Sequence, residues 1–238
     1  MTDPVRRALL VAAAALPAAC AAPGSSGPST SVNAATLRVG DRWRYQLINR
    51  FRNQWIGAPV WEVAATEPEL RLKVTNLRGG AVLEERWADP WRVREEIIFG
   101  IPMVYAEPQP LVPVPIEAGR VLNTVTTYRE AGSGPARPWR QRLSSGPWET
   151  IEVPAGRYEC LRISRFVAFT HPDTFRASST RSETLWYAPA VGRWVQREWR
   201  GEYVSLGQGD GNPAEGLTAP EEWQMLQLTA WLPAATSG

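Results

Sequence analysis

Several residue types that build common catalytic and binding sites are scarce in this 238-residue sequence. It contains one histidine, His171, and one lysine, Lys73, and its only cysteines are Cys20 and Cys160. A single histidine excludes a metal site built from several histidines, and the sequence has no Gly-x-Ser-x-Gly elbow and no glycine-rich phosphate loop. We therefore expect no metal, no cofactor and no catalytic residue, and we expect that the protein is not an enzyme.

An excess of charge of one sign is also absent. The sequence has 26 basic and 24 acidic residues, which give a formal net charge of +2. Nucleic-acid binding requires clustered positive charge, so we expect no nucleic-acid partner. The hydrophobic share of 44% is typical of a globular protein, while 21 prolines and 19 glycines leave few windows for long helices. The composition therefore favours an all-β protein.

The longest apolar run lies near the N-terminus and no later stretch matches it. Ala8 to Leu16 follows a positive region that contains Arg6 and Arg7. Nine apolar residues are too few to span a bilayer core, which needs about 20, but they are typical of a signal peptide. We predict that residues 1–19 are a signal peptide and that the mature protein has no transmembrane helix.

The end of this segment reads LPAAC, from Leu16 to Cys20, and resembles the lipobox of bacterial lipoproteins. The resemblance implies that Cys20 is lipidated, and residues 20–36 would then form a flexible tether to the membrane. Ala21 follows the cysteine, and the absence of an aspartate there implies the outer membrane, with the domain facing the periplasm. Ordinary signal-peptidase cleavage near Cys20 is the alternative.

The second cysteine would be unpaired if Cys20 carries lipid. Cys160 lies in a β-rich run and has no histidine beside it in the sequence. We therefore predict a buried structural thiol at Cys160. A disulfide between Cys20 and Cys160 is the alternative.

Alternation of apolar and polar residues predicts the strands. Trp43, Tyr45 and Leu47 alternate with Arg42 and Arg44, which is the period of a half-buried strand. Similar runs joined by short turns recur along the chain, and they predict about a dozen antiparallel strands in a single all-β domain, residues 37–238. The other runs are 59–66, 70–76, 82–87, 92–99, 121–128, 139–143, 148–153, 158–169, 179–187, 193–203 and 224–232.

Turns and irregular segments are predicted from proline and glycine. Hairpin turns are expected at 78–81, 153–156 and 189–192. The proline-rich segment 100–118 lacks too many amide donors for a sheet interior, so we expect an extended surface segment there. The polar, glycine-containing segment 207–222 is expected to be a loop.

Three short pieces resemble a family of uncharacterised bacterial envelope lipoproteins. They are VGDRWRY from Val39, EVPAGRYECLRI from Glu152 with its "VPAG" hairpin, and ETLWYAPAVGRWV from Glu183 with its "WYAP..G" strand and turn. A looser similarity to periplasmic lipoprotein carriers implies a curved antiparallel sheet, a β-clam or an open barrel, whose concave face holds acyl chains. The resemblance implies architecture and is silent about activity.

Tryptophan is unusually abundant, with 12 residues. Five lie within predicted strands, and we expect them in the core: Trp43, Trp87, Trp148, Trp186 and Trp194. Trp55, Trp91 and Trp139 lie near turns or strand ends, so we expect them to be partly exposed. Exposed rings can stack on sugars or lie against acyl chains, and these three are the candidate ligand-binding residues.

These patterns favour a lipid-anchored periplasmic protein that binds an apolar or amphiphilic envelope ligand without catalysis. Its partners would be the membrane, through the N-terminal lipid, and a lipid or glycan ligand. A protein-interaction module in envelope assembly and a glycan-active enzyme are the alternatives. The last is disfavoured because Glu84–Glu85 and Glu95–Glu96 are neighbours on strands and point to opposite faces. His171 is expected in a surface turn.

Overall fold

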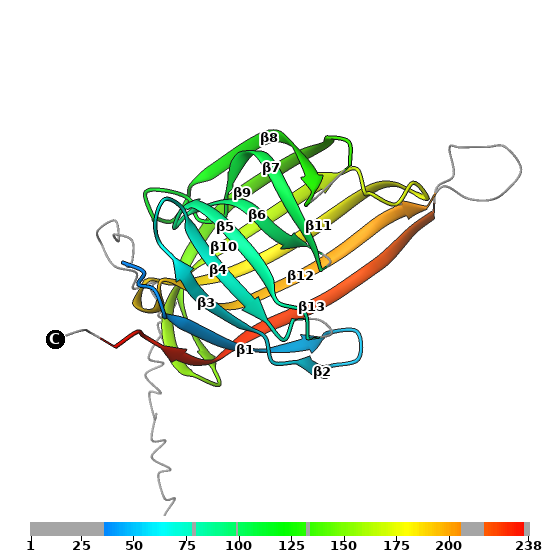
Figure 1. Cartoon of the computed structure of the whole chain (residues 1–238). Coiled ribbons are helices and arrows are strands. Elements are labelled where there is room, and N and C mark those ends of the chain that lie inside the picture. Colours follow the sequence, from blue (N-terminus) through cyan, green and yellow to red (C-terminus); the bar gives the residue numbers. More distant parts are fainter. Residues whose placement is uncertain (1–35, 78–79, 99, 132–133, 206–216, 236–238) are drawn as a thin grey trace, which may run out of the picture.

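The computed structural model describes residues 36–77, 80–98, 100–131, 134–205 and 217–235 (Figure 1). The signal peptide and most of the tether, including Cys20, lie outside the described residues. The described part is built from strands and one short 3₁₀ helix, η1 (Pro189–Val191). The strands are β1 (Arg42–Asn49), β2 (Gln54–Gly57), β3 (Val60–Ala65), β4 (Leu70–Thr75), β5 (Leu83–Asp89), β6 (Arg92–Ile98), β7 (Ile101–Pro110), β8 (Val121–Glu130), β9 (Arg137–Val153), β10 (Gly156–Phe169), β11 (Arg176–Ala188), β12 (Arg193–Ser205) and β13 (Leu217–Leu232).

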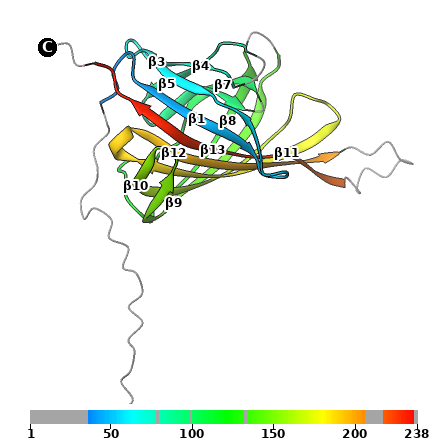
Figure 2. The same ribbon diagram turned by 90° about the horizontal axis from the view of Figure 1, so that it is seen from below.

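All strands belong to one curved antiparallel sheet, as the sequence predicts. From β3 to β13 each strand pairs with the next one along the chain, and β1 lies beside β3. The sheet then closes, because β13 also pairs with β1 along its length, from Arg42 opposite Leu232 to Asn49 opposite Gln224 (Figure 2). The result is a closed barrel of twelve strands, with β2 attached to β1 outside the ring.

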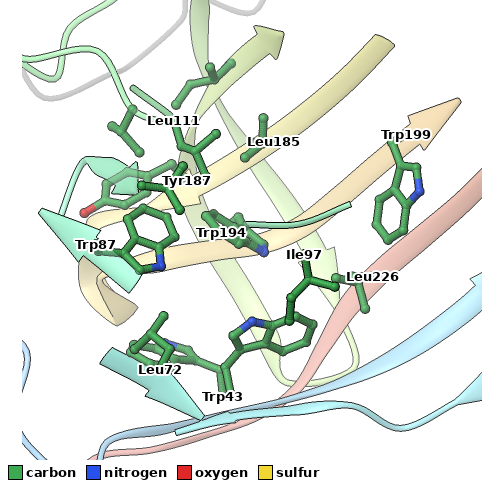
Figure 3. Close-up of a cluster of buried hydrophobic side chains, with 14 of the residues drawn as sticks. Trp43, Leu72, Trp87, Ile97, Leu111, Leu185, Tyr187, Trp194, Trp199 and Leu226 are labelled. Carbon is green, nitrogen blue, oxygen red and sulfur yellow. The ribbon is translucent and has the colours of Figure 1, made fainter. Parts of the chain in front are cut away.

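The predicted alternation places the apolar side chains inside this barrel. In β1, Trp43, Tyr45 and Leu47 are buried, whereas Arg42 and Arg44 are exposed on the outer surface. Successive side chains of a strand point to opposite faces, so one alternating run has both a face in the core and a face exposed to solvent. Tryptophan and other large side chains from several strands meet in the interior (Figure 3).

Two of the predicted hairpins are confirmed. Pro154 and Ala155 join β9 to β10, and η1 joins β11 to β12. Gly192 follows η1 with φ of +65° and Gly156 opens β10 with φ of +130°, conformations that side chains with a Cβ rarely adopt. The third expected turn, 78–81, lies partly outside the described residues.

The proline-rich segment 100–118 was expected to be an extended surface segment outside the sheet, and this was wrong for its first half. Its first half is strand β7, which pairs with β6 from Ile101 opposite Ile98 to Pro110 opposite Arg92. On its other side β7 pairs with β8 only from Met103 to Tyr105. Within the described residues, the rest of that edge of β7 has no strand partner. A proline nitrogen that faces this edge therefore removes no hydrogen bond between strands.

The expected loop 207–222 also needs correction at its C-terminal end. Strand β13 begins at Leu217 and pairs with β12 from that residue onward. The rest of the predicted loop, residues 207–216, lies outside the described residues.

Candidate functional site

The interior of the barrel holds charged side chains as well as apolar ones. Six of them, from five neighbouring or facing strands, form one connected cluster that we name the lumen network. Each is at most 8% exposed. The members of the lumen network are Glu96 on β6, Arg165 on β10, Arg181 and Glu183 on β11, Arg197 on β12 and Glu222 on β13.

Arg165 lies at one end of the lumen network and is held on both sides. Its Nη1 and Nη2 each donate to one carboxylate oxygen of Glu96 over 2.9 Å, the bidentate arrangement in which arginine binds carboxylates most strongly. Its Nε donates to Oε1 of Gln141 over 2.7 Å. Tyr105 adds a further donor, since its hydroxyl lies 3.0 Å from Oε2 of Glu96. The Nη1 of Arg165 also lies 3.5 Å from Oε2 of Glu183, so the guanidinium is held by partners on β6, β9 and β11.

Arg197 connects Glu96 to the rest of the lumen network. Its Nη2 donates to Oε1 of Glu96 over 2.6 Å and to Oε2 of Glu183 over 2.8 Å. Arg181 pairs with Oε1 of Glu183 through its Nε, and its Nη1 donates to Glu222 over 2.9 Å. With three arginines and three glutamates, the network is neutral when all its members are ionised.

The surrounding arginines keep Glu96 and Glu183 ionised. Burial by itself would raise the pKa of Glu96, but Arg165 and Arg197 outweigh it and the pKa is lowered. The pKa of Glu183 is also lowered, because three arginines outweigh the effect of burial. Burial followed by the charge of Glu96 raises the pKa of Tyr105. Glu96 and Glu183 are therefore carboxylates at neutral pH and hold no proton to transfer there.

A second buried arginine site lies deeper among tryptophans. The guanidinium carbon of Arg193 lies 3.9 Å from the ring centre of Trp194, and three further tryptophan rings lie within 5.6 Å: Trp43, Trp61 and Trp87. Its Nη2 donates to Glu85 over 3.2 Å. Figure 3 shows Trp43, Trp87 and Trp194 converging from three strands. Cation–π contact and one ion pair together keep this charge inside the protein.

Next to both charged groups lies a cavity of about 280 Å³. Its apolar lining includes Leu47, Trp61, Ile97 and Leu226. Its polar lining includes Arg181, Arg197 and Glu222 of the lumen network, together with Glu85 and Gln224. Ile56, which is 43% exposed, also lines it, so the cavity reaches the surface beside β2.

One hydrogen-bond donor near the cavity lacks a partner. Trp61 is 3% exposed, and its Nε1 makes no hydrogen bond. That atom has almost no accessible surface, so it is buried in the packing around the ring and does not face the cavity. The cavity itself therefore combines apolar surface with paired charges.

The three tryptophans proposed from the sequence as ligand contacts do not lie at this cavity. Trp55 on β2 is 61% exposed, as expected, and its ligand role stays a prediction. Trp91 is half-buried, lies edge-on to Tyr187 and lines a separate hollow of about 450 Å³ with Pro108 and Leu122.

Trp139 is buried, so the expectation that it is partly exposed was wrong. It is fully buried, and its ring centre lies 4.9 Å from that of Tyr105 and 5.3 Å from that of Phe169. The guanidinium carbon of Arg165 lies 5.7 Å from the ring centre of Trp139. A ring with no exposed surface cannot stack on a ligand from solvent. Trp139 is a core residue, because it occupies an inward position of β9.

The tryptophans assigned to the core divide into two groups. Trp43, Trp87 and Trp194 are at most 2% exposed, which confirms the prediction. Trp148 and Trp186 are only half-buried at the edge of the core, so full burial was wrong for them. The indole of Trp186 donates to Glu149 over 2.5 Å, an interaction on the outer side of the sheet.

The remaining reactive side chains are also placed by the structure. Cys160 is fully buried as a free thiol, as predicted, and burial raises its pKa to about 12. His171 lies in a turn, but its side chain is buried, contrary to expectation, and its Nε2 lies 3.7 Å from Glu221. Burial and then the charge of Arg176 lower the pKa of His171 to about 4, so this histidine is neutral at pH 7.

The sequence interpretation missed the lumen network, although a signal for it existed. Arg165 lies two residues from both Ile163 and Val167, which are buried, so all three side chains point to the same inward face of β10. The same alternation places Glu96 inside and Glu95 outside, which confirms that neighbouring glutamates point to opposite faces. A charge at an inward position of a predicted strand indicates a buried partner of opposite charge.

Comparisons with known proteins give only distant likenesses. No protein-family model and no curated protein matches the chain. A protein from Parabacteroides distasonis described as a lipoprotein has a TM-score of 0.48 and 13% identity, over 82% of this chain and 96% of that one. The hypothetical lipoprotein YmcC from Escherichia coli has a TM-score of 0.41 and 12% identity, over 82% and 86%. An exported protein from Bacteroides fragilis with a YmcC-like fold has a TM-score of 0.40 and 12% identity, over 84% and 98%.

These values assign neither a family nor an activity to the chain. Among the described residues, no helix is long and apolar enough to cross a membrane. In the same part of the chain, no three histidine, cysteine, aspartate or glutamate side chains are grouped so that they could hold a metal ion.

Proposed function

We propose that this protein is a lipid-anchored envelope protein that binds a small amphiphilic ligand in its barrel cavity without catalysing a reaction. The observation that supports the binding role is the cavity, which is lined both by apolar side chains and by four charged ones, Glu85, Arg181, Arg197 and Glu222. Ligand pockets are typically apolar with a few fixed polar groups.

The size and charge of the cavity narrow the class of ligand. Ligand pockets usually measure about 300–1,000 Å³, and this cavity of about 280 Å³ lies at the lower limit. This volume is too small for a whole two-chain lipid and is closer to that of one short alkyl chain, whose headgroup would lie toward the opening beside β2. The charged side chains that line the cavity are two glutamates and two arginines, Glu85, Glu222, Arg181 and Arg197, so their charges cancel. A neutral or zwitterionic headgroup matches this wall best.

Binding is tested by calorimetric titration with octyl compounds of equal chain length. We expect octylphosphocholine, which is zwitterionic, to bind more tightly than octanoate or octyltrimethylammonium. Ile56→Ala removes apolar surface where the cavity reaches the exterior, and it should weaken binding by about fourfold, the contribution of roughly one buried methylene. Val125→Ala is the matched control, because Val125 is 76% exposed and does not line the cavity. Equal affinities for the three compounds, or equal effects of the two substitutions, would contradict the proposal.

The anchoring part of the proposal is supported by the sequence LPAAC, from Leu16 to Cys20, and by the polar segment after it. We expect Cys20→Ser to abolish incorporation of radioactive palmitate and to release the protein from the membrane fraction. Cys160→Ser is the control and should be labelled like the wild type, since that thiol is buried in the folded domain. Equal labelling of the Cys20→Ser variant and the wild type would rule out lipidation at Cys20.

A further inference from the structure

The outer surface of β9 to β13 carries two ordered rows of side chains. Cross-strand pairing aligns the first row from β9 to β13, and the second row lies two residues further along each strand from β9 to β12. The first row is Arg142, Phe166, Ser182, Arg200 and Trp223. The second row is Ser144, Ser164, Thr184 and Glu198.

These nine side chains line a shallow groove of about 460 Å³, which we name the outer groove. They point away from the barrel interior, because their neighbours on the same strands, such as Arg165 and Glu183, are buried inside. The outer groove is therefore separated from the lumen cavity by the sheet itself. Figure 1 shows the long strands β9 to β13, which carry these side chains, running side by side.

An aromatic ring lies in the middle of this polar surface. Phe166 is 47% exposed, and it is paired directly with Arg142 on one side and Ser182 on the other. A single exposed apolar side chain is ordinary on a protein surface. Here, however, the ring is placed between a guanidinium and hydroxyl groups inside a hollow, so that all three can contact one molecule.

The charge of this surface is mainly positive and partly unmatched. The carboxylate of Glu198 is engaged, since the indole of Trp223 donates to it over 2.6 Å and Arg50 lies 3.6 Å away. Arg200 pairs with Glu202 over 2.9 Å at an exposed site. Within the described residues, Arg142 has no ion pair, and neither do Arg140 and Arg162, which point outward on the same two strands.

We propose that the outer groove binds an acidic polysaccharide chain. The C–H face of a sugar ring would pack on Phe166, and the planar fork of Arg142 suits a sugar carboxylate. The hydroxyls of Ser144, Ser164 and Ser182 can donate to and accept from ring hydroxyls. The row arrangement matches an extended chain that crosses several strands, and this binding is independent of the amphiphile cavity.

The probe is a galacturonate oligosaccharide, whose rings each bear one carboxylate, titrated into the full chain. We expect Phe166→Ala to weaken binding about five- to tenfold through the lost ring contact. Arg142→Gln should weaken binding about tenfold and reduce its dependence on salt, because a charge-assisted contact is lost. Both side chains are exposed, so equal melting temperatures should show that the variants are folded.

Matched variants and probes separate sugar recognition from simple charge attraction. Phe175→Ala removes a ring that is 64% exposed in the turn before β11, and Arg44→Gln removes an exposed arginine of β1. Neither should change the affinity. Neutral dextran and polyphosphate, which lack the charge and the ring respectively, should both bind more weakly than the galacturonate chain. Binding of polyphosphate as tight as that of galacturonate, or a loss in Phe175→Ala equal to that in Phe166→Ala, would overturn the proposal.

Discussion

Arg165→Met is expected to lose about 3–5 kcal/mol of unfolding free energy, the usual cost of breaking a buried ion pair by removing one partner. Arg165 is 1% exposed, and it binds both carboxylate oxygens of Glu96. Methionine fills much of the space but leaves the lumen network with three glutamates and two arginines. The uncompensated negative charge would remain in the barrel interior, where water cannot solvate it. Urea unfolding followed by far-UV circular dichroism measures the loss.

Restoring the charge balance should recover part of that loss. Arg165→Met combined with Glu96→Gln leaves two charges of each sign in the network, so we expect the double variant to be more stable than Arg165→Met alone. Arg42→Met is the control for an exposed pair, since Arg42 and Glu62 are 48% and 33% exposed, and it should cost less than about 1 kcal/mol. A double variant less stable than Arg165→Met would show that charge balance does not govern this site.

Trp43→Ala is expected to destabilise the protein by about 3–5 kcal/mol through lost burial and the cavity left behind. Trp43 is fully buried, and its ring is stacked on Trp231 with centres 4.9 Å apart. Its Nε1 also donates to the carbonyl of Val191 over 2.8 Å, so the substitution leaves a buried acceptor without its partner. The same residue contacts Arg193, which would lose one wall of its aromatic surroundings.

Trp55→Ala is the matched comparison for this substitution. Trp55 is 61% exposed on a strand outside the closed ring, so its loss should change stability by less than about 1 kcal/mol. Urea unfolding of both variants is followed by far-UV circular dichroism, because removal of a tryptophan alters the fluorescence signal. If Trp43→Ala unfolds at the same urea concentration as the wild type, the core assignment of Trp43 is wrong.

The strands of this fold could be predicted from the sequence because their signal is local. The alternation of Trp43, Tyr45 and Leu47 with arginines has the period of a strand, and it locates both faces of β1. Closure of the barrel has no local signal, since it depends on the pairing of β1 with β13. Strand β7 was missed because its prolines argue against pairing on both sides, whereas much of this strand pairs on only one.

The candidate site was less accessible from the sequence than the fold. The alternation of apolar residues with arginines correctly places Arg42 and Arg44 on the outer surface, but it gave no expectation that Arg165 and Arg197 are buried inside. The distinction depends on which residues lie across the barrel, such as Glu96 opposite Arg165. Those partners are 69 positions apart in the sequence, and only the folded chain brings them together.

The pairing of β1 with β13 has a consequence for how the chain reaches its final state. The first strand of the barrel is completed by β13, so the ring cannot form before the chain as far as Leu232 is present. Until then, β1 exposes one unpaired edge, which is a site at which chains can associate wrongly. Contacts between such distant segments also slow folding, because the chain between them must be ordered before they meet. A chain whose β13 is unpaired or removed therefore keeps the ring open at β1, even when every other neighbouring pair of strands has formed.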